Sequence, residues 1–226
     1  EGKVKIAHSY LPALHYAYHD GQRKYAYDPP AAEKLLDEAG WKKGSDGIRV
    51  KDGHRLHLEF GTTAENKIRE LVQQVLQQDW QRVGIEVEMK NEPPSVFFGQ
   101  TTHKRKFKHL AMYAWLLSPV QAGDGLWRGD MIPSKENNWQ GQNMAGLRND
   151  EITQLTIAGE KEIDVSKRIK IIKRVQEIYA DQLPAIPLYF RVNTSVTSKR
   201  LKGWRPTGTL VPISWNSHEW RLEGGQ

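Results

Sequence analysis

The chain has 226 residues, of which 38% are hydrophobic and none is cysteine, so it can bury one sizeable core or two small ones but can form no disulfide, thiolate metal site or cysteine nucleophile. Lys and Arg outnumber Asp and Glu by 33 to 27, which gives a net charge of +6 and raises the question of a nucleic-acid or anionic-surface partner. No run approaches the ~20 apolar residues of a membrane-spanning helix and no secretory leader pattern is recognisable, so the composition indicates a globular domain and leaves its compartment open.

The first quarter of the chain contains a connector, a helix and a hairpin. Residues 1–27 are rich in His and Tyr, have weak periodicity, and are predicted to form an extended connector. In "YDPPAAEKLLDEAGW", Asp28 is a predicted N-cap, Pro29 occupies the first helical position, and Gly40 is a predicted C-cap. Two alternating runs joined by Asp52 and Gly53 predict a β-hairpin, whose second strand continues to Gly61.

The next segments predict a mostly parallel sheet. An apolar stripe of helical spacing predicts a long helix that ends at Gly84. Before this helix, Thr62 and Glu65 have the spacing of a capping box. The stripe consists of Ile68, Leu71, Val72, Val75, Leu76, Trp80 and Val83. Strands are predicted over "IEVEMKN" and "FKHLAMYAWLL", with a short helix begun at Pro93 between them. This order favours right-handed crossovers and places three strand segments in one sheet, namely Leu56–Gly61, Ile85–Lys90 and Leu110–Ala114.

Two capped helices and two strands follow in the last third. Asn149 is predicted to cap a helix through about Glu162, and Asp164 a second helix through about Gln182. The segments "LPAIPLYF" and "NTSVTS" are predicted strands, and the prolines in the first favour a sheet edge.

Several of these segments together resemble the peptide/nickel-binding family of ABC-importer solute-binding proteins, family 5. They occur in the order of the family and span Tyr27 to Phe190: "YDPPAAEKLLDEAGW", "LVQQVLQQDWQRVGIEVEMK", "YAWLLSP", "NNWQGQNMAGLRNDEI" and "RIKIIKRVQEIYADQLPAIPLYF". The resemblance implies an α/β fold, a type II periplasmic-binding-protein-like lobe with a mostly parallel mixed sheet flanked by helices. It also implies a connector from a preceding N-terminal lobe over residues 1–27, a C-terminal lobe over 28–205, and a tail over 206–226 that returns toward the preceding lobe.

The same resemblance implies substrate capture without bond chemistry or a cofactor. Two lobes would close on a peptide or related polar solute by a hinge motion and present it to ABC permease membrane subunits. The implied location is periplasmic or extracellular, and membrane-associated, in a bacterium.

The loop after the last predicted parallel strand is the candidate ligand site, because ligands of open parallel sheets bind beyond the carboxyl ends of the strands. Peptide binders of the family hold the ligand ammonium with an Asp three residues after a Trp. Here Trp115 is followed at that spacing by Ser118, whose hydroxyl offers a neutral hydrogen bond without a charge. Asp124 is either a substitute carboxylate or a solvated loop acid. The predicted ligand-binding residues are Trp115, Leu116, Leu117, Ser118, Asp124, Trp127 and Trp139, and part of the patch formed by Trp115, Leu117, Trp127 and Trp139 is expected to be solvent-accessible.

Other patterns keep two alternative functions open. The basic runs "HKRKFKH" and "SKRIKIIKR" are interpreted as solvated faces, because no RNP motif, zinc finger or Gly-x-x-Gly loop accompanies them. His15 and His19 have a spacing that suits a cation on a helix, but Pro12 argues against a helix, so surface histidines are predicted and no metal is assigned. No catalytic motif is recognised. An enzyme domain of unrecognised type and a nucleic-acid or anionic-surface module remain the alternatives.

Overall fold

The computed structural model describes residues 4–118, 121–192, 194–207 and 212–224. The chain forms two compact units, and each is assembled from separate stretches of sequence. The sheet unit comprises Tyr25–Ala114 and Met131–Met144, and the helical unit comprises Glu1–Lys24, Trp115–Asp130 and Ala145–Gln226. The domain boundaries expected after residues 27 and 205 stay predictions.

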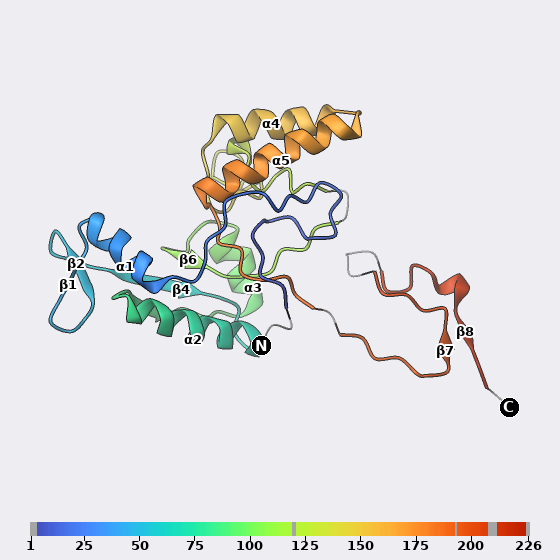
Figure 1. The fold of residues 1–226 in the computed structure, drawn as a ribbon, viewed down its shortest axis with the longest axis horizontal. Coiled ribbons are helices and arrows are strands. Elements are labelled where there is room, and N and C mark those ends of the chain that lie inside the picture. The colour runs from blue at the N-terminus through green and yellow to red at the C-terminus, as the bar shows by residue number, and fades with distance from the viewer. Residues whose placement is uncertain (1–3, 119–120, 193, 208–211, 225–226) are drawn as a thin grey trace. The chain divides into compact units, whose positions relative to one another are not determined.

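The sheet unit has α/β architecture (Figure 1). Its elements in chain order are α1 Pro29–Glu38, β1 Lys42–Lys43, β2 Arg49–Lys51, β3 His54–Arg55, β4 His57–Gly61, α2 Lys67–Arg82, β5 Glu86–Met89, α3 Pro94–Val96, a π-helical segment Phe97–Thr102, and β6 Leu110–Ala111. Strands β5, β4 and β6 form a parallel sheet in that order, with Leu58 opposite Val87 and Phe60 opposite Leu110. Helix α2 packs against β5, and β1, β2 and β3 form a separate antiparallel sheet. The predicted grouping of three strand segments in one sheet is confirmed.

Local signals of the sheet unit form as the sequence predicts. The Asp28 carboxylate accepts a hydrogen bond from the Ala31 amide at 3.0 Å and so caps α1. Asp52 and Gly53 link β2 to β3 with φ angles of 51° and 77°, the positive values that a two-residue hairpin turn requires. Pro93 precedes α3, as expected for a proline at the start of a helix.

Arg49 holds the sheet unit together from inside. Its side chain is 1% exposed, and Nη1 donates to Asp37 Oδ1 at 2.6 Å and to the Trp41 carbonyl at 2.7 Å. Nε donates to the carbonyl of Val83 at 2.7 Å, which connects α1 and β2 to the end of α2. A Cβ on Gly84 would lie 2.7 Å from Arg49 Cγ, so the close approach of the two segments requires glycine there.

The start of α2 differs from the prediction. Asn66 is the N-cap, because its side-chain oxygen accepts from the Arg69 amide at 3.2 Å. Thr62 is fully buried and its hydroxyl donates to the Met112 carbonyl at 2.8 Å, so it cannot act as the cap. The capping-box prediction for Thr62 and Glu65 is therefore wrong, because tertiary packing of Thr62 takes precedence over its local spacing.

Only part of the apolar stripe of α2 is buried. The fully buried residue of this helix is Gln73, whose Nε2 donates to the Phe60 carbonyl at 2.6 Å. Three residues that the stripe predicted to be inside have exposed fractions of 58% to 66%, namely Ile68, Leu71 and Val75. The helix is thus anchored to β4 by a polar side chain as well as by apolar packing.

Strand β6 is shorter than the predicted strand over Leu110–Leu117. Its partner β4 ends at Gly61, which lies opposite Ala111. The Met112 amide donates to the Gly61 carbonyl at 2.8 Å, and the Met112 carbonyl is taken by the Thr62 hydroxyl, so the ladder stops there. Because no neighbouring strand continues, Trp115–Ser118 lie outside any strand of the described chain.

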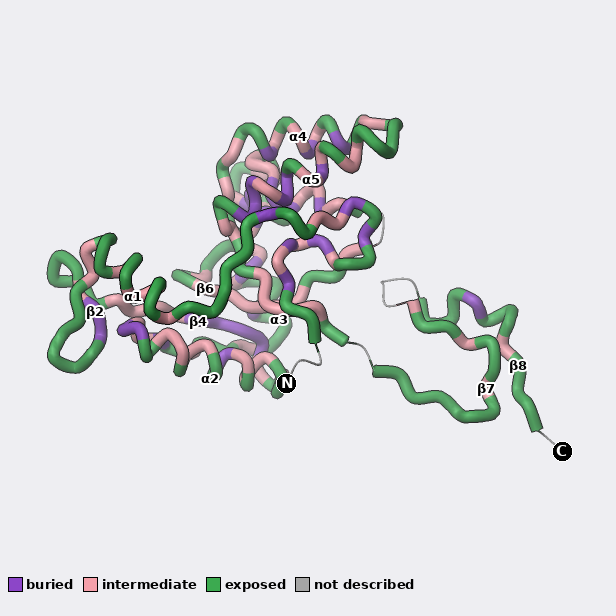
Figure 2. Tube along the Cα trace, in the orientation of Figure 1, coloured by how far each residue is buried: buried purple, intermediate pink, exposed green. Residues whose placement is uncertain are grey.

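The helical unit is built on α4 Asp150–Lys161 and α5 Val165–Gln182, which pack against each other. Asn149 and Asp164 cap them through side-chain oxygens that accept from Ile152 and from Ser166 and Lys167, as predicted. Figure 2 shows buried positions repeating along α5. The main core cluster consists of Leu126, Trp127, Ile152, Val175, Ile178 and Tyr179. The unit also contains β7 Leu201–Lys202, β8 Arg221–Leu222 and the short 3₁₀ segment Ser217–Glu219.

Residues near the N-terminus complete the core of the helical unit. Leu11 and Ala17 are fully buried together with Ile172 of α5. The fully buried Gln176 accepts from the Ser9 hydroxyl at 2.9 Å and donates to the Ala17 carbonyl at 2.8 Å. The segment that the sequence describes as an extended connector therefore packs on α5 over much of its length.

The two predicted strands after α5 do not form as such. Tyr189 makes one isolated antiparallel bridge to Ile6, and residues 194–198 contain no strand; Asn193 lies outside the described residues. Parts of the predicted tail, residues 208–211 and 225–226, also lie outside them. None of the helices in the described ranges is both long and apolar enough to cross a membrane.

Candidate ligand-binding site

The predicted site residues Trp115–Ser118 begin the helical unit's second stretch of chain. Trp115 and Leu116 are 39% and 60% exposed, whereas Leu117 packs against both core clusters of the unit. The expectation that part of the aromatic patch is accessible is confirmed for Trp115. Exposed apolar side chains next to a buried one leave a wall that a solute can contact.

Ser118 uses its hydroxyl locally. Its Oγ accepts from the Gln121 amide at 3.2 Å, and its carbonyl lies 3.3 Å from the same amide. The hydroxyl hydrogen is a donor that this turn does not use. Ser118 therefore offers a ligand a neutral donor, and no charge.

The other predicted tryptophans differ in their surroundings. Trp127 is 8% exposed, with its ring centroid 5.5 Å from that of Tyr10 and 4.8 Å from that of Tyr179. These two tyrosines cover it, so Trp127 does not belong to the accessible part of the patch. Trp139 is half-buried in the sheet unit, at a tight turn where Asn138 and Trp139 have φ angles of 54° and 61°. The structure thus places six of the seven predicted residues in the helical unit and Trp139 in the sheet unit.

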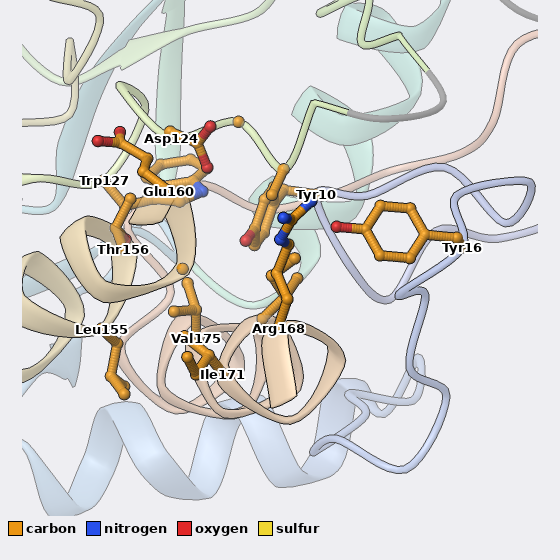
Figure 3. A pocket seen from close by; sticks show the side chains of 14 residues that line it. Tyr10, Tyr16, Asp124, Trp127, Leu155, Thr156, Glu160, Arg168, Ile171 and Val175 are labelled. Carbon is orange, nitrogen blue, oxygen red and sulfur yellow. The ribbon is translucent and has the colours of Figure 1, made fainter. Parts of the chain in front are cut away.

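Asp124 borders a cavity of about 210 Å³ inside the helical unit. The cavity is lined by the loop over residues 122–127, by one face each of α4 and α5, and by Tyr10 and Tyr16. Figure 3 shows the side chains of Asp124, Trp127 and Glu160 gathered on one side of it. Leu155, Ile171 and Val175 supply apolar surface from the two helices.

The electrostatics of this cavity shift the titration of Asp124. Burial, and then the charge of Glu160, raise the pKa of the Asp124 carboxyl above its usual value, while Arg128 and Arg168 act in the opposite direction. Burial likewise raises the pKa of Tyr10, with a further contribution from Asp124. The Asp124 carboxyl thus lies half-buried at the edge of the cavity.

The lining residues that were not singled out from the sequence include Tyr10, Tyr16, Glu160 and Arg168. The two tyrosines lie in the predicted connector, Glu160 lies on the helix predicted after Asn149, and Arg168 lies in the basic run that was interpreted as a solvated face. No local pattern signals such a cavity, because the chain segments that form it are separated by more than a hundred residues.

The histidine pair does not form a cation site. His15 was predicted to lie on the surface but is 3% exposed, and its Nδ1 accepts from the Ala17 amide at 3.1 Å. The prediction is wrong because the segment folds back onto α5, and burial lowers the pKa of His15. His19 Nδ1 accepts from the Gly21 amide at 3.4 Å, and its Nε2 lies 3.6 Å from Glu177 Oε1. Among the described residues, no group of three or more potential ligands suits a metal ion.

Comparisons with known proteins give a consistent result. The model of the bacterial extracellular solute-binding proteins, family 5, matches residues 1–129. The oligopeptide-binding protein OppA of Bacillus subtilis is 26% identical over 217 residues, which cover 92% of this chain and 36% of that protein. The chain therefore spans about a third of the length of this relative.

Two solved structures show the same fold. The oligopeptide-binding protein of Thermus thermophilus, crystallised with a pentapeptide, is 36% identical with a TM-score of 0.83, over 90% of this chain and 36% of that one. AppA of Bacillus subtilis, in complex with a nonapeptide, is 24% identical with a TM-score of 0.83, over 99% of this chain and 43% of that one. The predicted α/β fold of the type II periplasmic-binding-protein kind is confirmed.

Proposed function

Because the chain belongs to the bacterial extracellular solute-binding proteins of family 5, we propose that it is part of the substrate-capture component of an ABC importer for peptides or a related polar solute. The family consists of binding proteins, so the alternatives of an enzyme domain and of a nucleic-acid module are set aside. The observation that carries the peptide assignment is the 36% identity, over 90% of this chain, to a protein crystallised with a pentapeptide.

The chain acts as one of two lobes in this proposal. Residues 28–205 form the C-terminal lobe, residues 1–27 lead in from a preceding lobe, and residues 206–226 return toward it. Support comes from the share of the relatives that the chain covers, which is 36% for OppA and 43% for AppA. The two lobes close on the solute and deliver it to membrane permease subunits, in a periplasmic or extracellular, membrane-associated setting.

The solute contacts the loop that follows β6. β6 ends at Ala111, and Trp115–Ser118 lie outside any strand of the described chain, an arrangement that suits contact with an extended ligand. Trp115 and Leu116 supply apolar contact, and Ser118 donates a neutral hydrogen bond. Trp139 is retained as a predicted contact from the sheet unit.

Calorimetric titration of the intact protein tests this function. Pentaalanine and its N-acetylated form should both bind, with similar affinity, because Ser118 supplies no charge for the free ammonium group. Trp115→Ala should weaken both peptides about tenfold through the lost apolar contact.

Ile163→Ala is a matched control, because Ile163 is 87% exposed between α4 and α5 and should leave peptide affinity unchanged. If neither peptide binds to protein that unfolds cooperatively, the peptide assignment is contradicted.

A further inference from the structure

The cavity of the helical unit has a polar corner and an apolar floor. Asp124, Glu160 and the indole nitrogen of Trp127 lie at one side of it (Figure 3). The floor is made by Ile171 and Val175 of α5, together with Leu155 of α4. Such a division suits a ligand with a polar head and a compact aliphatic body.

Two polar groups in this corner have no hydrogen-bond partner within the described chain. The Trp127 side chain is 8% exposed, and its buried Nε1 finds no acceptor there. No hydrogen bond or ion pair of the described residues involves the half-buried Asp124 carboxylate. A buried donor without an acceptor destabilises the folded state, so Trp127 Nε1 gains from a ligand that accepts from it, and the Asp124 carboxylate gains from a ligand that donates to it.

The neighbouring guanidinium groups are already occupied. Arg128 donates to Asp130 at 2.6 Å and to Glu160 at 2.8 Å. Arg168 donates through Nε to the Glu162 carbonyl at 2.7 Å. Glu160 is therefore neutralised by a direct partner, whereas Asp124 has no cation in contact among the described residues. The contact that Asp124 lacks is therefore one with a positively charged group.

We propose that this cavity binds a small amine in which an ammonium group and an oxygen acceptor sit on neighbouring carbons. The ammonium group donates to Asp124, and the oxygen accepts from Trp127 Nε1. The aliphatic body lies on Ile171 and Val175. Both unmatched groups are satisfied by one ligand, and the charge of Asp124 is balanced.

The size of the cavity limits the ligand. A volume of about 210 Å³ exceeds the ~150 Å³ cavity that accepts benzene, but it is below the roughly 300 to 1,000 Å³ of pockets for drug-sized molecules. A compact amino alcohol fits this range and a peptide does not. The inference concerns the helical unit alone and is independent of the proposed solute capture.

Three probes that differ by one group test the proposal on the intact wild-type protein. Leucinol carries both head groups, isohexanol lacks the amine, and isopentylamine lacks the hydroxymethyl group. Binding is followed by the indole resonance of Trp127 in the nitrogen–proton correlation spectrum, which Trp127→Phe identifies by its loss. Leucinol should bind about tenfold more tightly than isohexanol and more tightly than isopentylamine.

Variants separate the two head-group contacts. Asp124→Asn should abolish the advantage of leucinol over isohexanol, and Trp127→Phe, followed by calorimetry, should reduce leucinol to the affinity of isopentylamine. Asp181→Asn is the control, because Asp181 is an exposed α5 acid that does not line the cavity. Equal affinity for leucinol and isohexanol in the wild-type protein, or an advantage that persists in folded Asp124→Asn protein, would overturn the proposal.

Discussion

The sheet unit and the helical unit differ in how far apart their contacting residues lie in the sequence. In the sheet unit, β4, α2 and β5 follow one another and pack directly, and the Arg49 side chain reaches residues at most 34 positions away. In the helical unit, Gln176 bonds to Ser9 and Ala17 across more than 150 positions. Patterns in a short window therefore predict the first unit well, whereas in the second they predict the two helices and their caps but miss the contacts of the N-terminal segment.

The largest expected effect tests the interior of the sheet unit. Arg49→Met removes donors from the Val83 and Trp41 carbonyls and leaves Asp37 without its partner, so the free energy of unfolding should fall by about 3 kcal/mol. Urea denaturation of the intact protein measures this. Arg55→Met is the matched control, because Arg55 pairs with Asp46 and Glu86 at the surface and should cost less than about 1 kcal/mol. Equal losses of unfolding free energy in the two variants would mean that the buried contacts of Arg49 stabilise the sheet unit no more than a surface ion pair does.

The next effect tests the long-range anchor of the helical unit. Gln176→Met leaves the Ser9 hydroxyl hydrogen and the His19 amide without an acceptor and the Ala17 carbonyl without its donor, and should cost about 2 kcal/mol. Proteolysis should also begin to cleave residues 4–24, because these bonds hold that segment on α5. Gln182→Met, at the exposed end of α5, is the control. Resistance of the segment in Gln176→Met would show that apolar packing alone holds it.

A smaller effect distinguishes the two possible caps of α2. Asn66→Ala removes the acceptor for the Arg69 amide and should lower the free energy of unfolding by about 1 kcal/mol. Glu65→Ala should leave it within about 0.5 kcal/mol, because the Glu65 side chain is exposed. A larger loss for Glu65→Ala than for Asn66→Ala in chemical denaturation would restore the capping box.

The smallest effect concerns the pH dependence of the helical unit. Asp124 has a raised folded-state pKa, from burial first and Glu160 second, so protonation favours the folded state. The stability that this preference contributes is complete below the unfolded pKa near 3.8 and is lost as pH rises through the folded pKa. The groups that face Asp124 are Glu160, Arg128, Arg168 and Tyr10.

Asp124→Asn should therefore be more stable than the wild-type protein at pH about 7, and the difference should shrink toward pH about 4. Urea denaturation at the two pH values measures both. An advantage of the variant that grows on acidification would contradict the sign of this effect.

Much of the sheet unit could be predicted from the sequence because its signals are local. The Asp28 cap and the Asp52–Gly53 turn depend on residues close in the chain, and the grouping of β4, β5 and β6 follows from the order of the strand and helix segments. The length of β6 could not be predicted, because it depends on where its partner β4 ends. The predicted capping box failed for a similar reason, since the buried Thr62 bonds to Met112.

The candidate site could be predicted only in part. The accessible Trp115 follows from its place after a strand, and the departure at Ser118 follows from spacing. The side chains that cover Trp127 could not be predicted, because Tyr10 and Tyr179 approach it from distant segments. Sequence patterns thus locate the loop, while the packing of distant segments decides which of its side chains a ligand can reach.

The most direct test of the proposed solute site is a charge placed at Ser118. If the loop contacts the solute, Ser118→Asp in the intact protein should strengthen binding of a peptide with a free N-terminus by about 1 to 3 kcal/mol, through a charge-assisted hydrogen bond. One carboxylate oxygen can replace the Ser118 acceptor for the Gln121 amide while the other faces the ligand. Calorimetry with pentaalanine and its N-acetylated form should show the gain for the free peptide only. Equal affinities for the two peptides in the Ser118→Asp variant would contradict the placement of this loop at the ligand.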